Sequence, residues 1–370
     1  MKVRYTPDVF RFQRAGGVSR YFVELARGLG SMGVDAKVIG GLHISDLLGS
    51  VRGSVGLNVG RLRPERARQA TTKGVDYVLT AAIIESLGRG DVLHPTWYPP
   101  RLEGLPKRAH LVVTVFDMIH ERYPDLSIGS DGTSRWKRAW VQRADHVIVI
   151  SEQTRRDLVE CFSVPPDKVS VTHLAPITVE ADGELLARCA RSRPFLLYVG
   201  DRRPAYKNFG RLLDALAAPP VPRDVALLCV GDPTPSAEEL SRITMLGLEA
   251  RVAFVSATDA ELAAYYHGAS ALVYPSLYEG FGLPPLEAMT SGCPVIAAEA
   301  ASIPEVVGDA ALLVPPTDVH ALANAIAEVL EPSTRTRLVE AGLRRSASFS
   351  WQSTVERTLD VYRLVVESGA

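Results

Sequence analysis

The chain has 370 residues, 46% of them hydrophobic and 22% charged, which is typical of a globular protein with two domains. The formal net charge is −1, but 25 of the 41 basic and 18 of the 42 acidic residues lie in positions 1–175, so this part carries +7 and the remainder −8. The asymmetry indicates two domains with different partners, and the modest basic excess without a known motif argues against nucleic-acid binding.

The chain start and the cysteines indicate a soluble, cytosolic protein. Positions 1–7 lack the apolar core of a signal peptide, and no apolar run approaches the roughly 18 residues of a membrane span. The four cysteines form no C-x-x-C pair and no metal-ligand spacing, so we expect reduced thiols and no bound metal. They are Cys161, Cys189, Cys229 and Cys293.

Short apolar runs alternate with amphipathic helical stretches along the chain, which predicts an α/β protein with parallel sheets. The strands expected in the first half are residues 3–5, 36–39, 91–94, 111–116 and 146–150. Residues 40–72 have weak periodicity with many Gly and Arg, and we expect them to form an irregular excursion.

Gly16 and Gly17 precede an amphipathic helix whose apolar positions recur at helical spacing. Two glycines at a helix start allow backbone amides to approach a phosphate, although simple packing also explains such a pair. Further along, the segment from Arg61 to Lys73 holds five basic residues and one acid. A solvated helix face accounts for this composition, and the functional alternative is contact with anionic lipid headgroups or a lipid-diphosphate acceptor.

The end of the strand at 91–94 bears His94, followed by Trp97 and Tyr98. Aromatic faces with polar edges suit sugars, so these three residues are candidates for an acceptor platform, with core and loop packing as the alternative. Asp117 and His120 follow the strand at 111–116. Asp117 is expected to orient a substrate hydroxyl and His120 to accept or share the acceptor's proton, unless His120 is an ordinary loop or capping histidine.

The second half begins after a polar, loop-like stretch at about 175–183, which we take as the interdomain linker. Its expected strands are residues 194–200, 226–230, 252–254, 271–274, 295–297 and 311–314, and an amphipathic helix at about 352–366 ends the chain. In such doubly wound sheets ligands bind at the carboxyl ends of the strands, so we expect the functional cleft between the two domains.

A basic loop follows the strand at 194–200, in the sequence Gly-Asp-Arg-Arg-Pro-Ala-Tyr-Lys. Two arginines and a lysine suit a diphosphate, because Arg binds two oxygens at once and Lys adds a point charge. The choice between the two arginines is open, and we favour Arg202 together with Lys207. A solvated basic turn is the alternative.

The segment Tyr-Pro-Ser-Leu-Tyr-Glu-Gly-Phe-Gly-Leu-Pro-Pro-Leu-Glu, residues 274–287, is the most informative in the chain. It follows a buried strand and opens a helix that should run to about Ser291, with Gly292 as its stop. Its loop amides and helix start form an anion cradle. Glu279 and Glu287 at the edges of such a cradle make sense if they bind hydroxyls of a sugar and a ribose, which indicates a nucleotide-sugar.

This segment resembles the Glu-x7-Glu motif of the GT-B retaining glycosyltransferases of family GT4. The flanking residues agree with the resemblance, including Gly-Cys-Pro-Val-Ile-Ala from Gly292 and Ile-Pro-Glu-Val-Val-Gly from Ile303. The basic loop also resembles the family's diphosphate-binding segment, and the Gly16-Gly17 opening resembles that of many members. One departure is Phe116, at a position where many relatives carry the His of a His-Asp pair.

The resemblance implies two Rossmann-like domains, at 1–175 for the acceptor and 176–350 for the nucleotide-sugar, with a helix at 351–370 that crosses back to the first. It implies a retaining, metal-independent hexosyltransferase without a cofactor, in which the leaving phosphate helps to deprotonate the acceptor. Catalytic roles would fall to Asp117, His120 and Glu279. Donor-binding roles would fall to Gly16, Gly17, Arg202, Lys207, Glu279, Gly280, Phe281, Gly282, Leu283 and Glu287.

The resemblance leaves the substrates open. Mannosyltransferases are frequent in the subgroup, so GDP-mannose is the expected donor, with UDP- and dTDP-sugars as alternatives, and the acceptor is a glycan, a lipid-linked sugar or a small molecule. We expect a cytoplasmic enzyme, peripheral at the inner membrane face if residues 61–73 bind lipid. A GT-B nucleotide-sugar epimerase and a non-catalytic nucleotide-sugar-binding protein are the rival functions.

Overall fold

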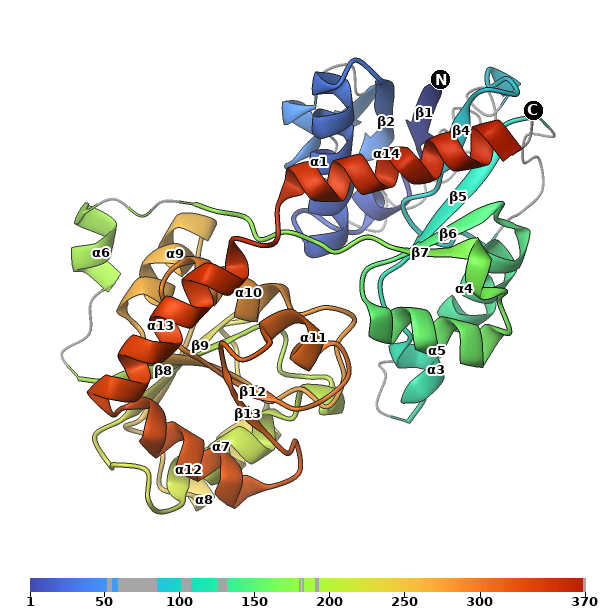
Figure 1. Ribbon diagram of the computed structural model, residues 1–370. Helices are drawn as coiled ribbons and strands as arrows, with labels where there is room; N and C mark the ends of the chain where they lie inside the picture. Colours follow the sequence, from blue (N-terminus) through green and yellow to red (C-terminus); the bar gives the residue numbers. More distant parts are fainter. Residues whose placement is uncertain are drawn as a thin grey trace. The chain divides into compact units, whose positions relative to one another are not determined.

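The computed structural model describes residues 1–51, 55–58, 85–100, 108–125, 132–179, 181, 183–189 and 193–368. The chain forms two compact units, each built around a parallel sheet (Figure 1). The first unit comprises Met1–Glu121, Ser130–Leu174 and Trp351–Ala370, and the second comprises Arg122–Gly129 and Ala175–Ser350.

The described strands of the first unit form a seven-stranded sheet in the order β3-β2-β1-β4-β5-β6-β7. All of their pairings are parallel. The strands are β1 (Lys2–Tyr5), β2 (Asp35–His43), β3 (Val55–Asn58), β4 (Val92–His94), β5 (His110–Val115), β6 (His146–Val149) and β7 (Val169–Val171). The helices are α1 (Gly17–Ser31), α3 (Ile119–Arg122), α4 (Thr133–Arg143), α5 (Glu152–Phe162) and α14 (Trp351–Ser368), with short 3-10 turns η1 (Val9–Arg11), η2 (Leu48–Ser50) and η3 (Pro166–Lys168).

The second unit has a six-stranded parallel sheet in the order β10-β9-β8-β11-β12-β13. Its strands are β8 (Phe195–Val199), β9 (Ala226–Val230), β10 (Val252–Val255), β11 (Ala271–Tyr274), β12 (Val295–Ala298) and β13 (Leu312–Val314). Its helices are α6 (Gly183–Cys189), α7 (Phe209–Ala217), α8 (Ala237–Met245), α9 (Asp259–Gly268), α10 (Leu283–Thr290), α11 (Ile303–Val307), α12 (Val319–Val329) and α13 (Pro332–Ser346), with the 3-10 turn η4 (Ala205–Lys207).

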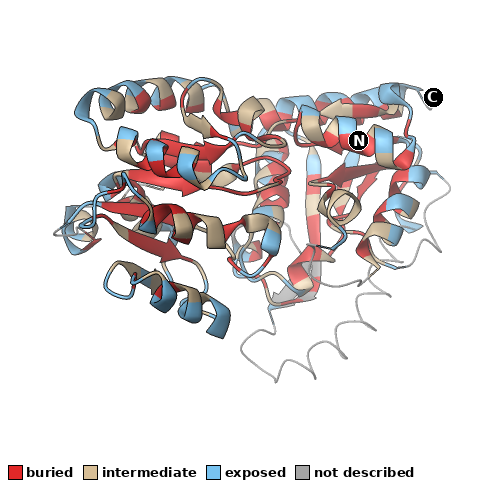
Figure 2. Ribbon diagram, turned by 90° about the horizontal axis from the view of Figure 1, so that it is seen from below, coloured by how far each residue is buried: buried red, intermediate tan, exposed pale blue. Residues whose placement is uncertain are grey.

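The second sheet is buried on both faces, because helices cover each side and successive side chains point in opposite directions. Leu196 and Tyr198 of β8 belong to one hydrophobic cluster, whereas Phe195 and Leu197 of the same strand belong to another. Figure 2 shows the resulting layers, with buried strands inside and exposed residues on the outer helix faces. The continuous apolar runs in the sequence therefore reflect double-sided burial.

The parallel α/β architecture confirms the sequence prediction, and the structure corrects it in two places. Strand β2 continues to His43 and pairs with β3, so residues 40–43 and 55–58 are not the irregular excursion that we expected. Strand β7 was also not predicted. Both missed strands have only three or four residues, and Gly56 weakens the β signal of β3, so their pairing depends on the neighbouring strand.

The long helix α14 packs on α1 within the first unit, at a close approach that requires a glycine. A Cβ atom on Gly28 would lie 2.5 Å from Cγ2 of Val355, so only a residue without a side chain fits there. Tyr362 of α14 reaches the core, where its hydroxyl lies 2.6 Å from Nδ1 of His94 and 3.1 Å from the hydroxyl of Tyr5. Nε2 of His94 lies 2.8 Å from Oγ1 of Thr114. This buried network joins α14 to the sheet.

The buried imidazole generates a pH prediction. Burial lowers the pKa of His94 from 6.5 to about 3, so the unfolded chain binds more protons than the folded protein between these values. The free energy of unfolding should therefore fall as the pH drops through this window, with His94 contributing at most about 1.4 kcal/mol per pH unit. Urea denaturation between pH 5 and 7 should show a shallower pH dependence for His94→Gln than for the unchanged protein. Equal slopes would contradict this assignment.

Candidate functional site

The candidate site of the second unit begins at the point where the order of its sheet reverses. Strand β8 pairs in parallel with β11, with Leu196 opposite Ala271 and Leu197 opposite Leu272, although β9 and β10 come between them in the chain. In open α/β sheets, ligands bind outside the carboxyl ends of the strands at such a switch point. The loops that leave β8 and β11 here are the two segments that the sequence marked for a diphosphate and a sugar.

The loop after β11 is held in shape by backbone contacts and a buried serine. The hydroxyl of Ser302 lies 2.8 Å from the carbonyl oxygen of Glu279 and 2.6 Å from that of Phe281. Gly282 has φ +130°, and a Cβ atom there would lie 2.9 Å from Ile303, so the sequence needs glycine at this turn. Helix α10 starts at the next residue, with Pro in its first turn, and ends before Gly292, as predicted.

The basic loop after β8 is hydrogen-bonded to the loop after β11. The N–H of Leu277 donates to the carbonyl oxygen of Tyr206 at 2.7 Å. The side-chain amide of Asn208 donates to the carbonyl oxygens of Pro275 and Pro316 at 2.9 and 2.7 Å. Asn208 itself adopts the left-handed conformation with φ +61°, which asparagine tolerates better than most residues. These contacts fix the backbone on both sides of Lys207.

Lys207 and Glu279 form an ion pair, with Nζ 2.7 Å from Oε1 and side chains only 16% and 11% exposed. The hydroxyl of Tyr274 is hydrogen-bonded to the same carboxylate, and the pKa of Tyr274 is raised by burial first and by the Glu279 charge second. The residues predicted to meet the diphosphate and the transferred sugar are therefore in direct contact. Both side chains of the pair are largely buried, so solvent screens their attraction less than it screens an exposed pair.

Glu287 lies on α10, half-buried, and accepts a hydrogen bond from the hydroxyl of Tyr266 at 3.3 Å. Burial raises the pKa of Tyr266, and the Glu287 charge raises it further. Phe281 is buried against Phe349, with ring centroids 5.8 Å apart. Gly280 and Gly282 are also buried, and Leu283 begins the helix. The structure thus places the predicted donor residues of the Glu-x7-Glu segment on one loop and one helix start.

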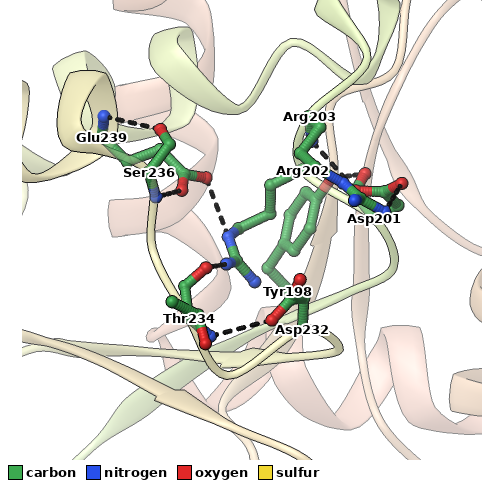
Figure 3. A network of polar contacts seen from close by, with 8 residues as sticks. All are labelled: Tyr198, Asp201, Arg202, Arg203, Asp232, Thr234, Ser236 and Glu239. Carbon is green, nitrogen blue, oxygen red and sulfur yellow. Dashed lines mark hydrogen bonds and ion pairs between the residues drawn. The ribbon is translucent and has the colours of Figure 1, made fainter. Parts of the chain in front are cut away.

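The two arginines of the basic loop point to opposite sides (Figure 3). Arg202 points inward, where Nε donates to Oε1 of Glu239 at 2.8 Å and the guanidinium lies 4.5 Å from the ring centroid of Phe254. Arg203 is exposed and donates to both carboxylate oxygens of Asp201, each at 2.8 Å. The adjacent residues therefore differ completely in their surroundings, a difference that the sequence pattern did not indicate.

In the first unit, Gly16 and Gly17 lie at the start of α1, as predicted. Gly16 is the N-cap, and Gly17 is the first helical residue. The N–H of Gly16 donates to Oγ of Ser19, and the N–H of Ser19 donates to the side-chain oxygen of Gln13. Part of this helix start is thus capped by the protein's own side chains.

Asp117 and Glu121, on either side of His120 in the chain, contact a lysine that the sequence analysis missed. Lys137 of α4 is 2% exposed, and its Nζ lies 2.8 Å from Oε2 of Glu121 and 2.9 Å from the carbonyl oxygen of Asp117. Nδ1 of His120 and Oε1 of Glu121 are buried without a hydrogen-bond partner among the described residues. Lys137 stands between other basic residues on an amphipathic helix, so only the tertiary structure distinguishes it.

The predicted acceptor platform does not form as a set. His94 is fully buried, and both of its ring nitrogens have partners within the first unit, so the structure corrects its assignment as an acceptor-binding residue. Tyr98 is buried and donates to the carbonyl oxygen of Thr114 at 2.9 Å. Trp97 is half-buried, and its ring centroid lies 5.4 Å from that of Phe12. The apolar periodicity of a strand end does not distinguish a ligand-facing aromatic from a core one.

Phe116, the departure from the family pattern, packs edge-on against Tyr21 and Phe22, with ring-centroid distances of 5.3 and 6.1 Å.

The predicted lipid contact from Arg61 to Lys73 lies outside the described residues. Within the described part of the chain, no three His, Cys, Asp or Glu residues gather into a group that could hold a metal ion. Likewise, none of the described helices is long and apolar enough to cross a membrane.

Comparisons with known proteins place both halves of the chain in glycosyltransferase families. Residues 15–175 match the Glycosyltransferase Family 4 model, and residues 193–332 match the Glycosyl transferases group 1 model. The chain is 35% identical over 227 residues to an MMP alpha-(1->4)-mannosyltransferase of Mycolicibacterium hassiacum, a match that covers 60% of this chain and 54% of that protein.

Two further relatives extend the comparison. The O-antigen chain mannosyltransferase B of Escherichia coli is 31% identical, over 59% of this chain and 60% of that protein. The D-inositol 3-phosphate glycosyltransferase of Kribbella flavida is 29% identical over 96% of this chain and 92% of that protein. The matched regions thus span less than two thirds of the two mannosyltransferases and nearly all of the third relative.

Solved structures show the same fold. Sucrose-phosphate synthase from Thermosynechococcus elongatus superposes with a TM-score of 0.73 at 22% identity, covering 99% of both chains. Anabaena HepE in complex with UDP and glucose superposes with a TM-score of 0.75 at 19% identity, covering 98% of this chain and 99% of that one. These similarities confirm the GT-B fold that the sequence resemblance implied.

The buried lysine generates a stability prediction. Lys137→Met removes the counter-charge of Glu121, whose side chain is 6% exposed, and we expect the free energy of unfolding to fall by about 3–5 kcal/mol. Urea denaturation measures this change. The double variant Lys137→Met/Glu121→Gln should recover part of the loss, because it no longer buries an unpaired carboxylate. A loss below about 1 kcal/mol in the single variant would contradict the role of Lys137 as a buried counter-ion.

Proposed function

Because the chain belongs to the GT4-type glycosyltransferases of the GT-B fold, we propose that it transfers a hexose from a nucleoside-diphosphate sugar to an acceptor hydroxyl. The observation that supports this most directly is the ion pair between Lys207 and Glu279 at the switch point of the second sheet. It places a cation suited to a diphosphate beside a carboxylate suited to sugar hydroxyls.

The proposed donor site assigns one chemical task to each group. Glu287 binds the ribose hydroxyls, and Glu279 binds hydroxyls of the transferred sugar. The backbone amides of Gly280, Phe281, Gly282 and Leu283 hold anionic oxygens at the start of α10. Lys207 and an arginine of the same loop neutralise the negative charge that grows on the diphosphate as the glycosidic bond breaks. Gly16 and Gly17 are proposed to allow backbone amides at the start of α1 to come close to a phosphate.

The proposed reaction retains the anomeric configuration and needs no metal. The acceptor oxygen attacks the anomeric carbon from the face that the diphosphate leaves, and the acceptor's proton passes to the departing phosphate. Fixed cations at the diphosphate supply the stabilisation that this charge separation requires. Asp117 is proposed to orient the acceptor or donor hydroxyl, and His120 to share the acceptor's proton. The buried contacts of Lys137 with Glu121 and with the Asp117 carbonyl support this, because they hold their loop in one conformation.

The names of the relatives support a mannosyl donor. Two of them are mannosyltransferases, and we propose GDP-mannose as the donor on this basis. UDP-glucose is the second candidate, since HepE, which shares the fold, has been solved in complex with UDP-glucose. The acceptor class is a hydroxyl of a glycan, a lipid-linked sugar or a small polar molecule. Contact with a membrane through residues 61–73 remains a prediction from their charge.

Substitution of Glu279 tests the chemistry. Glu279→Gln keeps the volume of the side chain but removes the charge that pairs with Lys207, and we expect kcat/KM for the donor to fall by about 100- to 1,000-fold. The assay is release of nucleoside diphosphate from GDP-mannose or UDP-glucose, with water or added methyl mannoside as acceptor. Glu261→Gln, at a partly exposed capping glutamate of α9, is the control. Undiminished turnover with Glu279→Gln would overturn the assignment.

A thermal-shift screen tests the donor and the metal requirement together. At a concentration 100 times its dissociation constant, GDP-mannose should raise the free energy of unfolding by about 2.7 kcal/mol. At the same concentration, UDP-glucose, dTDP-glucose and ADP-glucose should raise it less. The same shift is expected with excess EDTA. A larger response to another sugar nucleotide would replace the proposed donor, and loss of the response in EDTA would contradict metal-independent donor binding.

A further inference from the structure

Two adjacent arginines, Arg202 and Arg203, follow β8, and only Arg202 is buried and paired with an acidic residue inside the protein. The Arg202 side chain is 3% exposed, and its Nε donates to Oε1 of Glu239. Its Nη2 lies 3.4 Å from the carbonyl oxygen of Thr234, and the guanidinium stacks near Phe254. Nη1 has no partner among the described residues and is itself buried. The Arg202 side chain therefore presents almost none of its surface to a phosphate in this conformation.

Glu239, the partner of Arg202, is also fixed in place. Its Oε2 accepts the N–H of Ser236 at 2.7 Å, while its own N–H donates to Oγ of Ser236 at 3.1 Å. This reciprocal capping box begins α8, directly after the loop that leaves β9. Through Glu239, Arg202 ties the loop after β8 to the loop after β9 (Figure 3). A buried cation needs such a partner, and the pair acts as an internal brace.

Arg203 has the opposite character. Its side chain is 66% exposed, and it donates two parallel hydrogen bonds to the Asp201 carboxylate. That fork is also the geometry in which arginine binds phosphate. The pKa of Asp201 is lowered chiefly by its hydrogen bonds to Arg203 and also by the charge of Lys207, so the carboxylate lies in the field of both cations.

An exposed ion pair of this kind contributes little to stability and is readily exchanged. A diphosphate carries more negative charge than one carboxylate, and it offers Arg203 the same two-oxygen contact. Asp201 thus occupies, in the free protein, the place on the Arg203 guanidinium that an anionic ligand group would take.

We propose that Arg203, rather than Arg202, binds the donor's diphosphate together with Lys207, that Asp201 is displaced from Arg203 when the donor arrives, and that the Arg202–Glu239 pair braces the loop. This inference rests on the proposed function. It replaces the choice of Arg202 that the sequence pattern favoured, and it gives the acidic residue beside the arginines a role in setting donor affinity.

The experiment compares binding of a nucleoside diphosphate with binding of the matching monophosphate. Calorimetry with GDP and GMP, and with UDP and UMP, separates the contribution of the second phosphate from that of the rest of the nucleotide. Arg203→Gln should weaken diphosphate binding by about 10- to 100-fold and monophosphate binding much less. Asp201→Asn should tighten diphosphate binding several-fold, because it removes the competing carboxylate.

Variants of the brace should behave differently. Arg202→Gln and Glu239→Gln should lower the melting temperature, with the ratio of diphosphate to monophosphate affinity kept within about threefold in the folded protein. Glu261→Gln is a matched control: Glu261 forms the same kind of capping box with Thr258, and it pairs with the exposed Arg188 at 2.7 Å. It should leave the affinity ratio unchanged.

The outcomes distinguish this inference from the proposed function. If Arg203→Gln leaves the affinity ratio unchanged while Arg202→Gln lowers it, the assignment of the two arginines is overturned. If Asp201→Asn weakens diphosphate binding, the proposed displacement of Asp201 from Arg203 is overturned, because the carboxylate then assists ligand binding. If the unchanged protein binds none of GDP, UDP, dTDP and ADP, the proposed function itself fails, whatever the variants show.

Discussion

The donor-side arrangement depends on the hydrogen-bonded pairing of β8 with β11 in the second sheet. Two loops whose key residues are 72 positions apart in the chain leave that sheet side by side. Because parallel strands end at the same edge, the pairing brings Lys207 to within 2.7 Å of Glu279. The roles proposed for Lys207 and Glu279 use this juxtaposition. The contacts of Asn208, Leu277 and Ser302 then remove the freedom that the loops would otherwise have.

Buried cations with dedicated acids recur in both units. Lys137 pairs with Glu121 beside Asp117, and Arg202 pairs with Glu239 beside the basic loop. Each pair contributes little net stability over an apolar replacement of both partners, since desolvation offsets the attraction. What each pair does is specify one conformation for a loop that bears candidate functional residues. The exposed pair of Arg203 and Asp201 lacks that burial, which is why it suits exchange with a ligand.

The surroundings of His94 and of Phe116 share one physical origin. His94 ends a strand with a polar, aromatic sequence around it, a pattern equally compatible with sugar binding and with a buried network. The structure places its ring between Tyr362 and Thr114, so the imidazole serves to join α14 to the core. Phe116 stands where many relatives carry histidine, and here it packs against Tyr21 and Phe22. Both outcomes depend on residues that are distant in the chain.

The sequence by itself determined the parallel α/β architecture, eleven of the described strands, and the start and stop of α10, because strand burial, proline and glycine leave local patterns. It also identified the Glu-x7-Glu segment and the basic loop as one candidate donor site. Only the tertiary structure decided that Lys207 meets Glu279, that Arg202 is buried while Arg203 is exposed, and that Lys137 is a counter-ion. Regular elements have a period that assigns each residue a face, whereas the direction of a loop side chain, or of one lysine on an amphipathic helix, depends on contacts with distant parts of the chain.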